Sequence, residues 1–119
     1  MVQPPVIDQS KEVMAEVSAW AEAWAAKKID AYFSHYVDGF SGDMADANAW
    51  RNSRKTKISN SQQIKISFSD IKVRNNNNES VDVFFTQEYQ SGSYKDTGRK
   101  VLSLKKINGR WLISQETFK

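Results

Sequence analysis

The sequence contains no cysteine, and this excludes thiol catalysis, thiolate metal sites and disulfide bonds. Its single histidine, His35, is too few for a histidine-based zinc site. No apolar run approaches the roughly 18 residues of a membrane span, and the N-terminus lacks the basic-then-apolar order of a signal peptide. The chain also lacks a large excess of charge of one sign, since it has 17 basic and 14 acidic residues. So small a positive excess disfavours a dedicated nucleic-acid binder.

The length of 119 residues suits one domain, which can bury a core without disulfides or metal. Residues 1–9 contain Pro4 and Pro5 and show no periodicity, so we expect a linker or disordered leader there. Residues 10–119 are expected to form the single domain. A leader of this kind is typical of a domain excised from a longer protein.

The first half of the chain has the apolar spacing of helices. Asp8 or Ser10 is available to cap a long amphipathic helix that runs to about Lys27. Asp30 is in position to cap a second, shorter helix that ends near Gly39. A third helix is expected to carry three residues at positions i, i+4 and i+8 along one face. These are Trp50, Arg54 and Ile58.

After residue 61 the apolar period changes to two, which predicts strands. The first expected strand shifts its parity at Ser69 and Asp70, which indicates a bulge. The apolar face on either side of that bulge consists of Ile64, Ile66, Phe68, Ile71 and Val73. Residues 75–78 and 91–98 are polar and are expected to be loops around a strand at 81–91. Strands at 100–107 and 110–118 follow, joined by a type I′ turn at Asn108 and Gly109.

A two-residue turn fixes the register of the last hairpin. It is expected to pair Ile107 with Arg110, Lys106 with Trp111, Leu104 with Ile113 and Leu102 with Gln115. One face of that hairpin then carries Leu102, Leu104, Trp111 and Ile113. Three helices can bury their apolar stripes only against such a face. The predicted fold class is therefore α+β, with three N-terminal helices packed in a strongly curved antiparallel sheet of four strands or more.

Several motifs resemble the nuclear transport factor two-like superfamily, also called SnoaL-like, with its cone fold. In the helical half they are Trp20 with Trp24, Tyr36 with Phe40, and Trp50 with Arg54. In the strand half they are Gln87-x-Tyr89-x-Ser91, Lys100-x-Leu102-x-Leu104 and Gly109-x-Trp111-x-Ile113-x-x-Glu116. The strand motifs are similar to those in the C-terminal domain of bacterial L,D-transpeptidase-like and tetratricopeptide-repeat envelope proteins. The resemblance covers roughly residues 12–119 and implies a pocket between helices and sheet.

The candidate pocket residues are polar or aromatic and are expected on the inner surfaces. They are Tyr32, His35, Tyr36, Trp50, Arg54, Gln87, Tyr89 and Glu116. Gln87 stands where an apolar residue is due, so we expect it to bond to Tyr, Trp or Arg side chains of the helical layer. Arg54 either binds the carboxylate of a ligand or forms an ion pair with Glu116 while packing on Trp50.

No catalytic residue and no metal ligand are assigned. His35 with the neighbouring tyrosines could transfer protons, but a solvated or capping histidine is the simpler interpretation. Asp30 occupies the place of a helix cap, which is a structural role. Arg51, Arg54, Lys55 and Lys57 are interpreted as a solvated helix face rather than a binding patch. No cofactor is expected.

Two functions from different classes remain open. The first is a non-catalytic accessory module of a larger bacterial cell-envelope protein, which binds a small molecule or a neighbouring domain. The second is an isomerase or dehydratase with a pocket between helices and sheet. Dimerisation through the outer sheet face, at Val101, Ile107 and Leu112, is a third. The periplasm or envelope is expected for a part of a longer protein, and the cytoplasm otherwise.

Overall fold

The computed structural model describes residues 8–118. The helices are α1 (Ser10–Ala25), α2 (Ile29–Ser34) and α3 (Ala47–Asn60). The strands are β1 (Ile64–Asn77), β2 (Ser80–Ser91), β3 (Tyr94–Ile107) and β4 (Arg110–Phe118). Of the leader predicted at residues 1–9, residues 1–7 lie outside the described part, so the leader stays a prediction.

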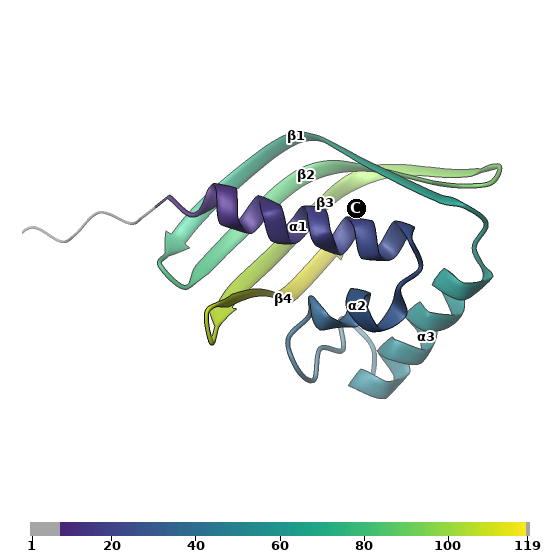
Figure 1. Ribbon diagram of the computed structural model, residues 1–119, viewed down its shortest axis with the longest axis horizontal. Helices are drawn as coiled ribbons and strands as arrows, with labels where there is room; N and C mark the ends of the chain where they lie inside the picture. Colours follow the sequence, from purple (N-terminus) through teal and green to yellow (C-terminus); the bar gives the residue numbers. More distant parts are fainter. Residues whose placement is uncertain (1–7, 119) are drawn as a thin grey trace, which may run out of the picture.

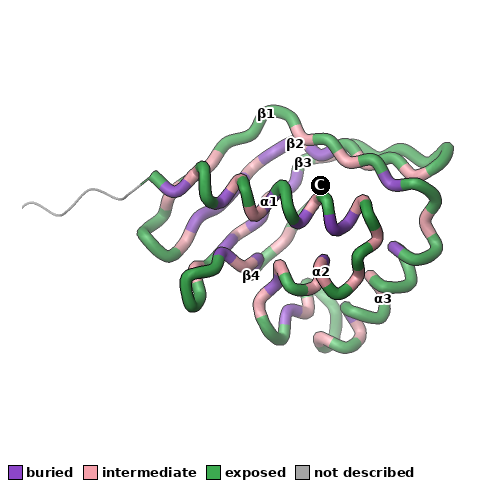
Figure 2. The backbone as a smooth tube through the Cα atoms, in the orientation of Figure 1, coloured by how far each residue is buried: buried purple, intermediate pink, exposed green. Residues whose placement is uncertain are grey.

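The four strands form one antiparallel sheet in the order β1-β2-β3-β4. The sheet curves around α1, with α2 and α3 packed beyond one end (Figure 1). Buried residues from α1 and from the inner face of the strands share one core (Figure 2). Its fully buried members include Val13, Val17, Trp20, Phe85 and Leu102. The predicted α+β fold with a curved sheet is confirmed.

The helix α1 follows its predicted apolar stripe, since Val17, Trp20 and Trp24 are buried. The predicted cap residues are not at the N-cap, which is Gln9 and has no capping side-chain bond. Gln9 is held instead by β1, because its backbone N–H donates to Oδ1 of Asn75. Asp8 still contributes, because its carboxylate accepts hydrogen bonds from the backbone and hydroxyl of Ser10.

The helix α2 is shorter than predicted and does not use Asp30 as its cap. Its N-cap is Lys28, so Asp30 lies in the first turn, where a negative charge still suits the helix dipole. The helix stops because the next residues pair with β4. The backbone N–H of Ile113 donates to His35, and that of Val37 donates to Ile113. His35 is still in the right-handed helical region, and the bridge to β4 begins at Tyr36, which pairs with Ile113.

The predicted bulge in β1 is present between Ser69 and Lys72, with Asp70 in the left-handed region at φ 52°. Val73 returns to the inner face opposite Val83, as expected. Ile71 does not, because it lies within the bulge and is 43% exposed.

Two predicted loops are strand. The strand β1 continues to Asn77, and β2 and β3 are separated only by Gly92 and Ser93. Both faces of these hairpin ends meet solvent, so the strands tolerate polar residues that a sequence pattern assigns to loops. The turn at Asn108 and Gly109 is confirmed, with φ of 50° and 80°.

The register of the last hairpin is as predicted from Ile107 to Leu104 but differs by one residue beyond it. Ser103 pairs with Gln115 and Leu102 with Glu116, so Ser114 is the extra residue of a bulge. Regular pairing would place Glu116 on the outer face of the sheet. The bulge reverses the parity and places Glu116 beside Leu102, on the inner face.

Candidate functional site

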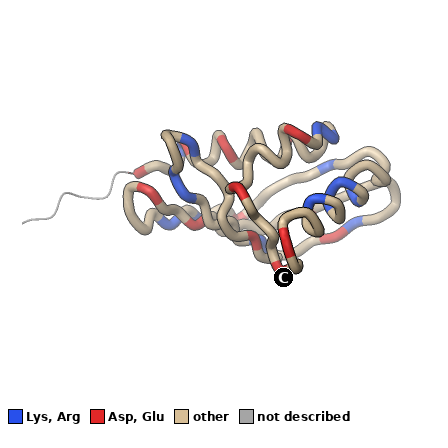
Figure 3. Tube along the Cα trace, turned by 90° about the horizontal axis from the view of Figure 1, so that it is seen from below, with Lys and Arg blue, Asp and Glu red and all other residues tan. Residues whose placement is uncertain are grey.

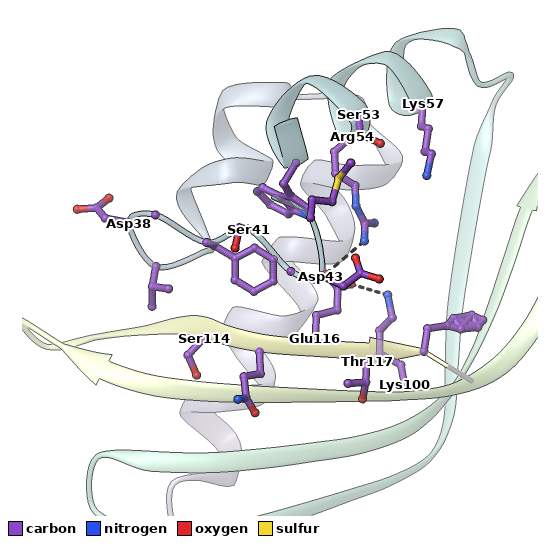
Figure 4. A pocket seen from close by; sticks show the side chains of 18 residues that line it. Asp38, Ser41, Asp43, Ser53, Arg54, Lys57, Lys100, Ser114, Glu116 and Thr117 are labelled. Atoms are coloured by element: carbon purple, nitrogen blue, oxygen red, sulfur yellow. Dashed lines mark hydrogen bonds and ion pairs between the residues drawn. The ribbon is translucent and has the colours of Figure 1, made fainter. Parts of the chain in front are cut away.

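A cleft of about 910 Å³ lies between the loop that joins α2 to α3, one face of α3 and the strand β4. Figure 4 shows the loop and α3 on one side and β4 on the other. The loop contributes Val37, Asp38, Gly39, Phe40, Ser41, Gly42, Asp43 and Met44. The helix contributes Trp50, Ser53, Arg54 and Lys57, and the sheet contributes Lys100 and residues 114–118. Its volume is in the range of small-molecule sites.

The centre of the cleft floor is the carboxylate of Glu116, whose side chain is 4% exposed. Its Oε2 accepts a hydrogen bond from Nζ of Lys100 at 2.6 Å, and its Oε1 accepts one from the Tyr36 hydroxyl at 2.9 Å. Nη2 of Arg54 lies 3.7 Å from Oε1. One buried carboxylate therefore serves two cations and a phenol.

Lys100 reaches this carboxylate from β3, because the alternation with Leu102 and Leu104 puts all three side chains on the inner face. The lysine side chain is 3% exposed. Its ammonium lies 5.4 Å from the ring centre of Trp20 and 5.3 Å from that of Trp24. The aromatic faces attract the cation and exclude water from it.

A chain of hydrogen bonds continues from Glu116 into the core. The Tyr36 hydroxyl, which donates to Glu116, is 3.0 Å from the Tyr32 hydroxyl. It also accepts a hydrogen bond of 3.0 Å from Nε1 of Trp20. Each of these polar atoms has a partner, as buried polar groups require. The chain holds Glu116 in one orientation.

Arg54 is the most accessible charge of the network, with 30% of its side chain exposed. The helix α3 places it one turn after Trp50, and the guanidinium carbon lies 5.9 Å from the tryptophan ring centre. Its 3.7 Å contact with Glu116 is longer than the usual charge-assisted hydrogen bond. The guanidinium also interacts with the Tyr32 hydroxyl, and its five N–H donors exceed these two contacts, so a ligand in the cleft can accept from the others.

The pKa values show a carboxylate that is kept ionised. Burial alone would raise the pKa of Glu116, but Lys100, Arg54 and the Tyr36 hydroxyl together lower it below its ordinary value of 4.5. Burial lowers the pKa of Lys100 from 10.5, against the opposing effect of Glu116. The pKa of Arg54 is raised by Tyr32, Glu116 and Tyr36 despite its burial. Arg54 stays charged at every ordinary pH.

The two tyrosines are weak acids. Burial, with the Glu116 charge second, raises the pKa of Tyr32 to about 12. The same causes raise the pKa of Tyr36 well above 10. Both hydroxyls therefore stay protonated at neutral pH and act as hydrogen-bond donors.

The cleft is lined by three basic residues, Arg54, Lys57 and Lys100, and by three acidic ones, Asp38, Asp43 and Glu116. Asp38 lies at the opposite end of the cleft from Arg54, so the end near Arg54 keeps three basic residues against two acidic ones (Figure 4). Opposite charge at such a partly enclosed site favours an anion, and a guanidinium suits a carboxylate in particular. The arrangement can bind an anionic group.

The structure brings together only part of the predicted pocket. Trp50, Arg54 and Glu116 line the cleft. Tyr32 and Tyr36 lie behind it, and they connect to it through the hydrogen bonds to Glu116.

The remaining predicted residues do not line the cleft. His35 caps the C-terminal end of α2, and its Nδ1 is 3.2 Å from Oε2 of Glu16. Tyr89 stacks on Trp24 and its hydroxyl is 3.2 Å from that of Ser61. His35 was expected to be solvated or capping, and it occupies the C-cap position of α2 with its side chain 11% exposed.

Gln87 is on the inner face as predicted and is 2% exposed. The hydrogen bonds expected for it are not there, because its Oε1 has no partner among the described residues. It lies opposite Phe68 on one side and Gly98 on the other, and neither offers a side-chain donor. The expectation of a satisfied amide is therefore wrong.

Sequence reasoning missed Lys100 and the loop between α2 and α3 as parts of the site. The signal for Lys100 was present, because the period of two that makes Leu102 and Leu104 inward makes Lys100 inward as well. Phe40 in the loop is buried, and it packs on Trp50 with 4.6 Å between ring centres. This contact fixes the loop at the mouth of the cleft.

The remaining predictions concern the outer sheet face, the surface charge, metal sites and membrane spans. On the outer sheet face Ile107 is 40% exposed, while Val101 and Leu112 are half-buried, and the dimer stays a prediction. Acidic and basic residues are interspersed (Figure 3). Within residues 8–118 no group of three or more possible ligands could hold a metal ion. No helix in this part of the chain is long and apolar enough to cross a membrane.

A family model described as the Cds6 C-terminal NTF2-like domain matches residues 12–117. A search of curated proteins found no match. Pgp2 of Campylobacter jejuni, a helical cell shape determining protein, has a similar domain in its K307A mutant structure. The identity is 26% and the TM-score 0.78, over 88% of this chain and 39% of that one.

Two further solved structures show the same fold. Bd1075 of Bdellovibrio bacteriovorus is 24% identical with a TM-score of 0.81, over 91% of this chain and 39% of that one. An NTF2-like protein of unknown function from Pseudomonas putida is 13% identical with a TM-score of 0.77, over 92% of this chain and 84% of that one. The chain thus spans about two fifths of the length of Bd1075 and Pgp2.

Proposed function

The chain belongs to the family of Cds6 C-terminal NTF2-like domains, and we propose that it is a non-catalytic accessory module that binds an anionic ligand in the cleft. The observation that carries this proposal is the excess of one positive charge at the end of the cleft near Arg54, where Arg54, Lys57 and Lys100 face Asp43 and Glu116. Lys100 neutralises the Glu116 carboxylate at 2.6 Å, whereas Arg54 lies 3.7 Å from it, lines the cleft and is 30% exposed. A carboxylate on the ligand would complete the charge balance.

The directions of the pKa shifts support binding over catalysis. A general acid or base works best with a pKa near the operating pH. Here the carboxylate is shifted down from 4.5 and the Tyr32 hydroxyl is shifted up to about 12. Neither group exchanges a proton readily near neutral pH. A preorganised charge is what binding an ion requires.

The relatives support a place within a longer protein. Pgp2 and Bd1075 are more than twice as long as the part that this chain matches. Pgp2 is named as a determinant of helical cell shape. We infer that residues 10–119 are an accessory domain of a longer bacterial cell-envelope protein. By binding the ligand, this domain would position the rest of that protein.

Titration of the ¹⁵N-labelled protein with N-acetylalanine tests the binding proposal. This probe carries one carboxylate, and its amide is the matched neutral control. The acid should shift the amide signals of residues around Arg54 and Glu116 in a saturable way, and the amide should not. Equal shifts from both compounds, or none, would contradict the proposal.

Two arginines on α3 provide matched variants. Arg54→Gln should abolish the saturable shifts because it removes the free cation. Arg51→Gln should leave them intact, because Arg51 lies over the Phe33 ring and does not line the cleft. Far-ultraviolet circular dichroism of both variants checks the fold. Retained binding by Arg54→Gln would refute the role of the guanidinium.

An isomerase or dehydratase is the second candidate, and the Tyr32–Tyr36–Glu116 chain favours it, since two phenols and a carboxylate adjoin the cleft. Such an enzyme would exchange the protons next to the carbonyl of a cyclic ketone. Deuterium incorporation into cyclohexanone in D₂O therefore distinguishes the classes. Incorporation faster than in buffer alone, and lost in Tyr36→Phe, would support catalysis.

A further inference from the structure

We propose that the cleft binds the C-terminal end of an extended peptide, which adds to the free edge of β4 and places its terminal carboxylate on Arg54. This inference rests on the proposed binding of an anion and identifies the class of ligand. It draws on the position of the cleft relative to the strand, on the pairing already present at that edge, and on the distribution of charge.

The lining of the cleft shows that it runs along the edge of the strand. Five consecutive residues of β4, Ser114 to Phe118, border it. Successive side chains of a strand point to opposite faces of the sheet. A cleft that is bordered by side chains of both sheet faces must lie beside the strand, where the backbone is accessible.

That backbone is a free sheet edge. β4 is the last strand of the sheet, and within residues 8–118 its outer side pairs only through the bridge between Tyr36 and Ile113. Beyond Ile113, alternate N–H and C=O groups on this side lack a strand partner in the described residues. An extended peptide can satisfy such groups by adding as a strand.

The existing bridge also indicates how a peptide would enter. Tyr36 pairs with Ile113 in parallel orientation, and Val37 donates to Ile113 at 3.0 Å. The chain then leaves the edge at Asp38. A bound peptide would continue this short parallel segment along Ser114 to Phe118. At about 3.3 Å per residue, this edge accommodates roughly four or five peptide residues.

Charge fixes the same direction. Figure 4 shows Asp38 at the end of the cleft near Ser114. At the end near Thr117 the basic residues Arg54, Lys57 and Lys100 outnumber the acidic Asp43 and Glu116 by one. A peptide in parallel orientation would place its C-terminal carboxylate at the basic end. The antiparallel orientation would place its carboxylate beside Asp38. Both the bridge and the charges thus favour the parallel strand.

The walls of the cleft suit side chains of such a peptide. Met44 is 39% exposed although it borders the cleft with Phe40 and Trp50. An apolar side chain that points from the added strand toward the loop would cover it. Flexible methionine adapts to side chains of different shape.

Binding of N-acetyl-tetra-alanine to the 119-residue chain tests the proposal, with affinity measured by NMR titration. Its C-terminal amide should bind about tenfold more weakly or worse, because the charged contact with Arg54 is lost. Two N-methylated forms, substituted at adjacent residues, provide the control. Only one N–H of the two faces β4, so one form should lose about fivefold and the other should bind nearly as well.

Hydrogen exchange adds a readout on the protein. The tetrapeptide should slow exchange of outward amides within residues 115–118, whereas N-acetylalanine should leave them unchanged. If N-acetylalanine binds at Arg54 but the tetrapeptide gains no affinity and no protection, the peptide proposal fails and anion binding stands. If neither compound binds, both proposals fail. Equal effects of the two N-methyl groups would exclude pairing with the edge.

Discussion

The buried pair of Lys100 and Glu116 allows a quantitative prediction, because removal of one buried charge strands the other. Their side chains are 3% and 4% exposed. Glu116→Gln keeps the shape of the side chain but leaves Lys100 and Arg54 without a counter-ion. Breaking a buried pair in this way costs about 3–5 kcal/mol of the free energy of unfolding.

The charges that each substitution leaves unpaired predict which variant loses more stability. Lys100→Met leaves Glu116 with Arg54, which is a balanced pair, and the thioether suits a site between Trp20 and Trp24. This variant should therefore be destabilised less than Glu116→Gln. The double variant should be less destabilised than the sum of the two single variants by about 0.5–3 kcal/mol.

Urea unfolding followed by tryptophan fluorescence measures all three free energies. Lys106→Gln is the matched control, because Lys106 is 35% exposed and lies 4.0 Å from the exposed Glu12, so its loss should cost no more than about 1 kcal/mol. Additive single and double variants would refute the reasoning. So would a Lys100→Met variant that is less stable than Glu116→Gln.

Three further results are expected. Because the pKa of Glu116 is lowered in the folded state, its ionised form stabilises the fold above pH 4.5, and this stabilisation is lost as the pH falls through the folded-state pKa. The free energy of unfolding should therefore fall on acidification below pH 4.5, and it should fall less in Glu116→Gln. Gln87→Leu should keep or raise the stability measured by urea unfolding, because it removes a buried oxygen without a partner, and a loss above about 1 kcal/mol would show that the amide is bonded. Tyr36→Phe should lower the thermal midpoint, at a cost of about 1–3 kcal/mol, because its hydroxyl joins Trp20 to Glu116; an unchanged midpoint would contradict this.

Much of the fold was predictable from spacing alone. The stripe from Val13 to Trp24, the face of Trp50 and Ile58, and the Asn108 turn all specify their elements locally. The motifs of both halves also indicated the family correctly. The hairpin ends were not predictable in this way, because exposed strands and loops share a polar composition.

The site depended on one event that a regular pattern conceals. Glu116 was expected on the inner surface, yet a register counted from the turn places it outward, and only the bulge at Ser114 turns it inward. The inward direction of Lys100 could be predicted, because Lys100 is two residues from the inward Leu102. The same alternation does not predict which residue Lys100 contacts. The expected ion pair of Arg54 with Glu116 is present at 3.7 Å. The pairing of Lys100 with Glu116 across the sheet arises only in the folded chain and needed the structure.

A crystal structure of the protein with N-acetyl-tetra-alanine tests the central claim most directly. We expect the terminal carboxylate within hydrogen-bonding distance of the Arg54 guanidinium, with the peptide paired in parallel to residues 114–118. A peptide carboxylate located elsewhere, with the cleft beside Arg54 empty, would contradict the account.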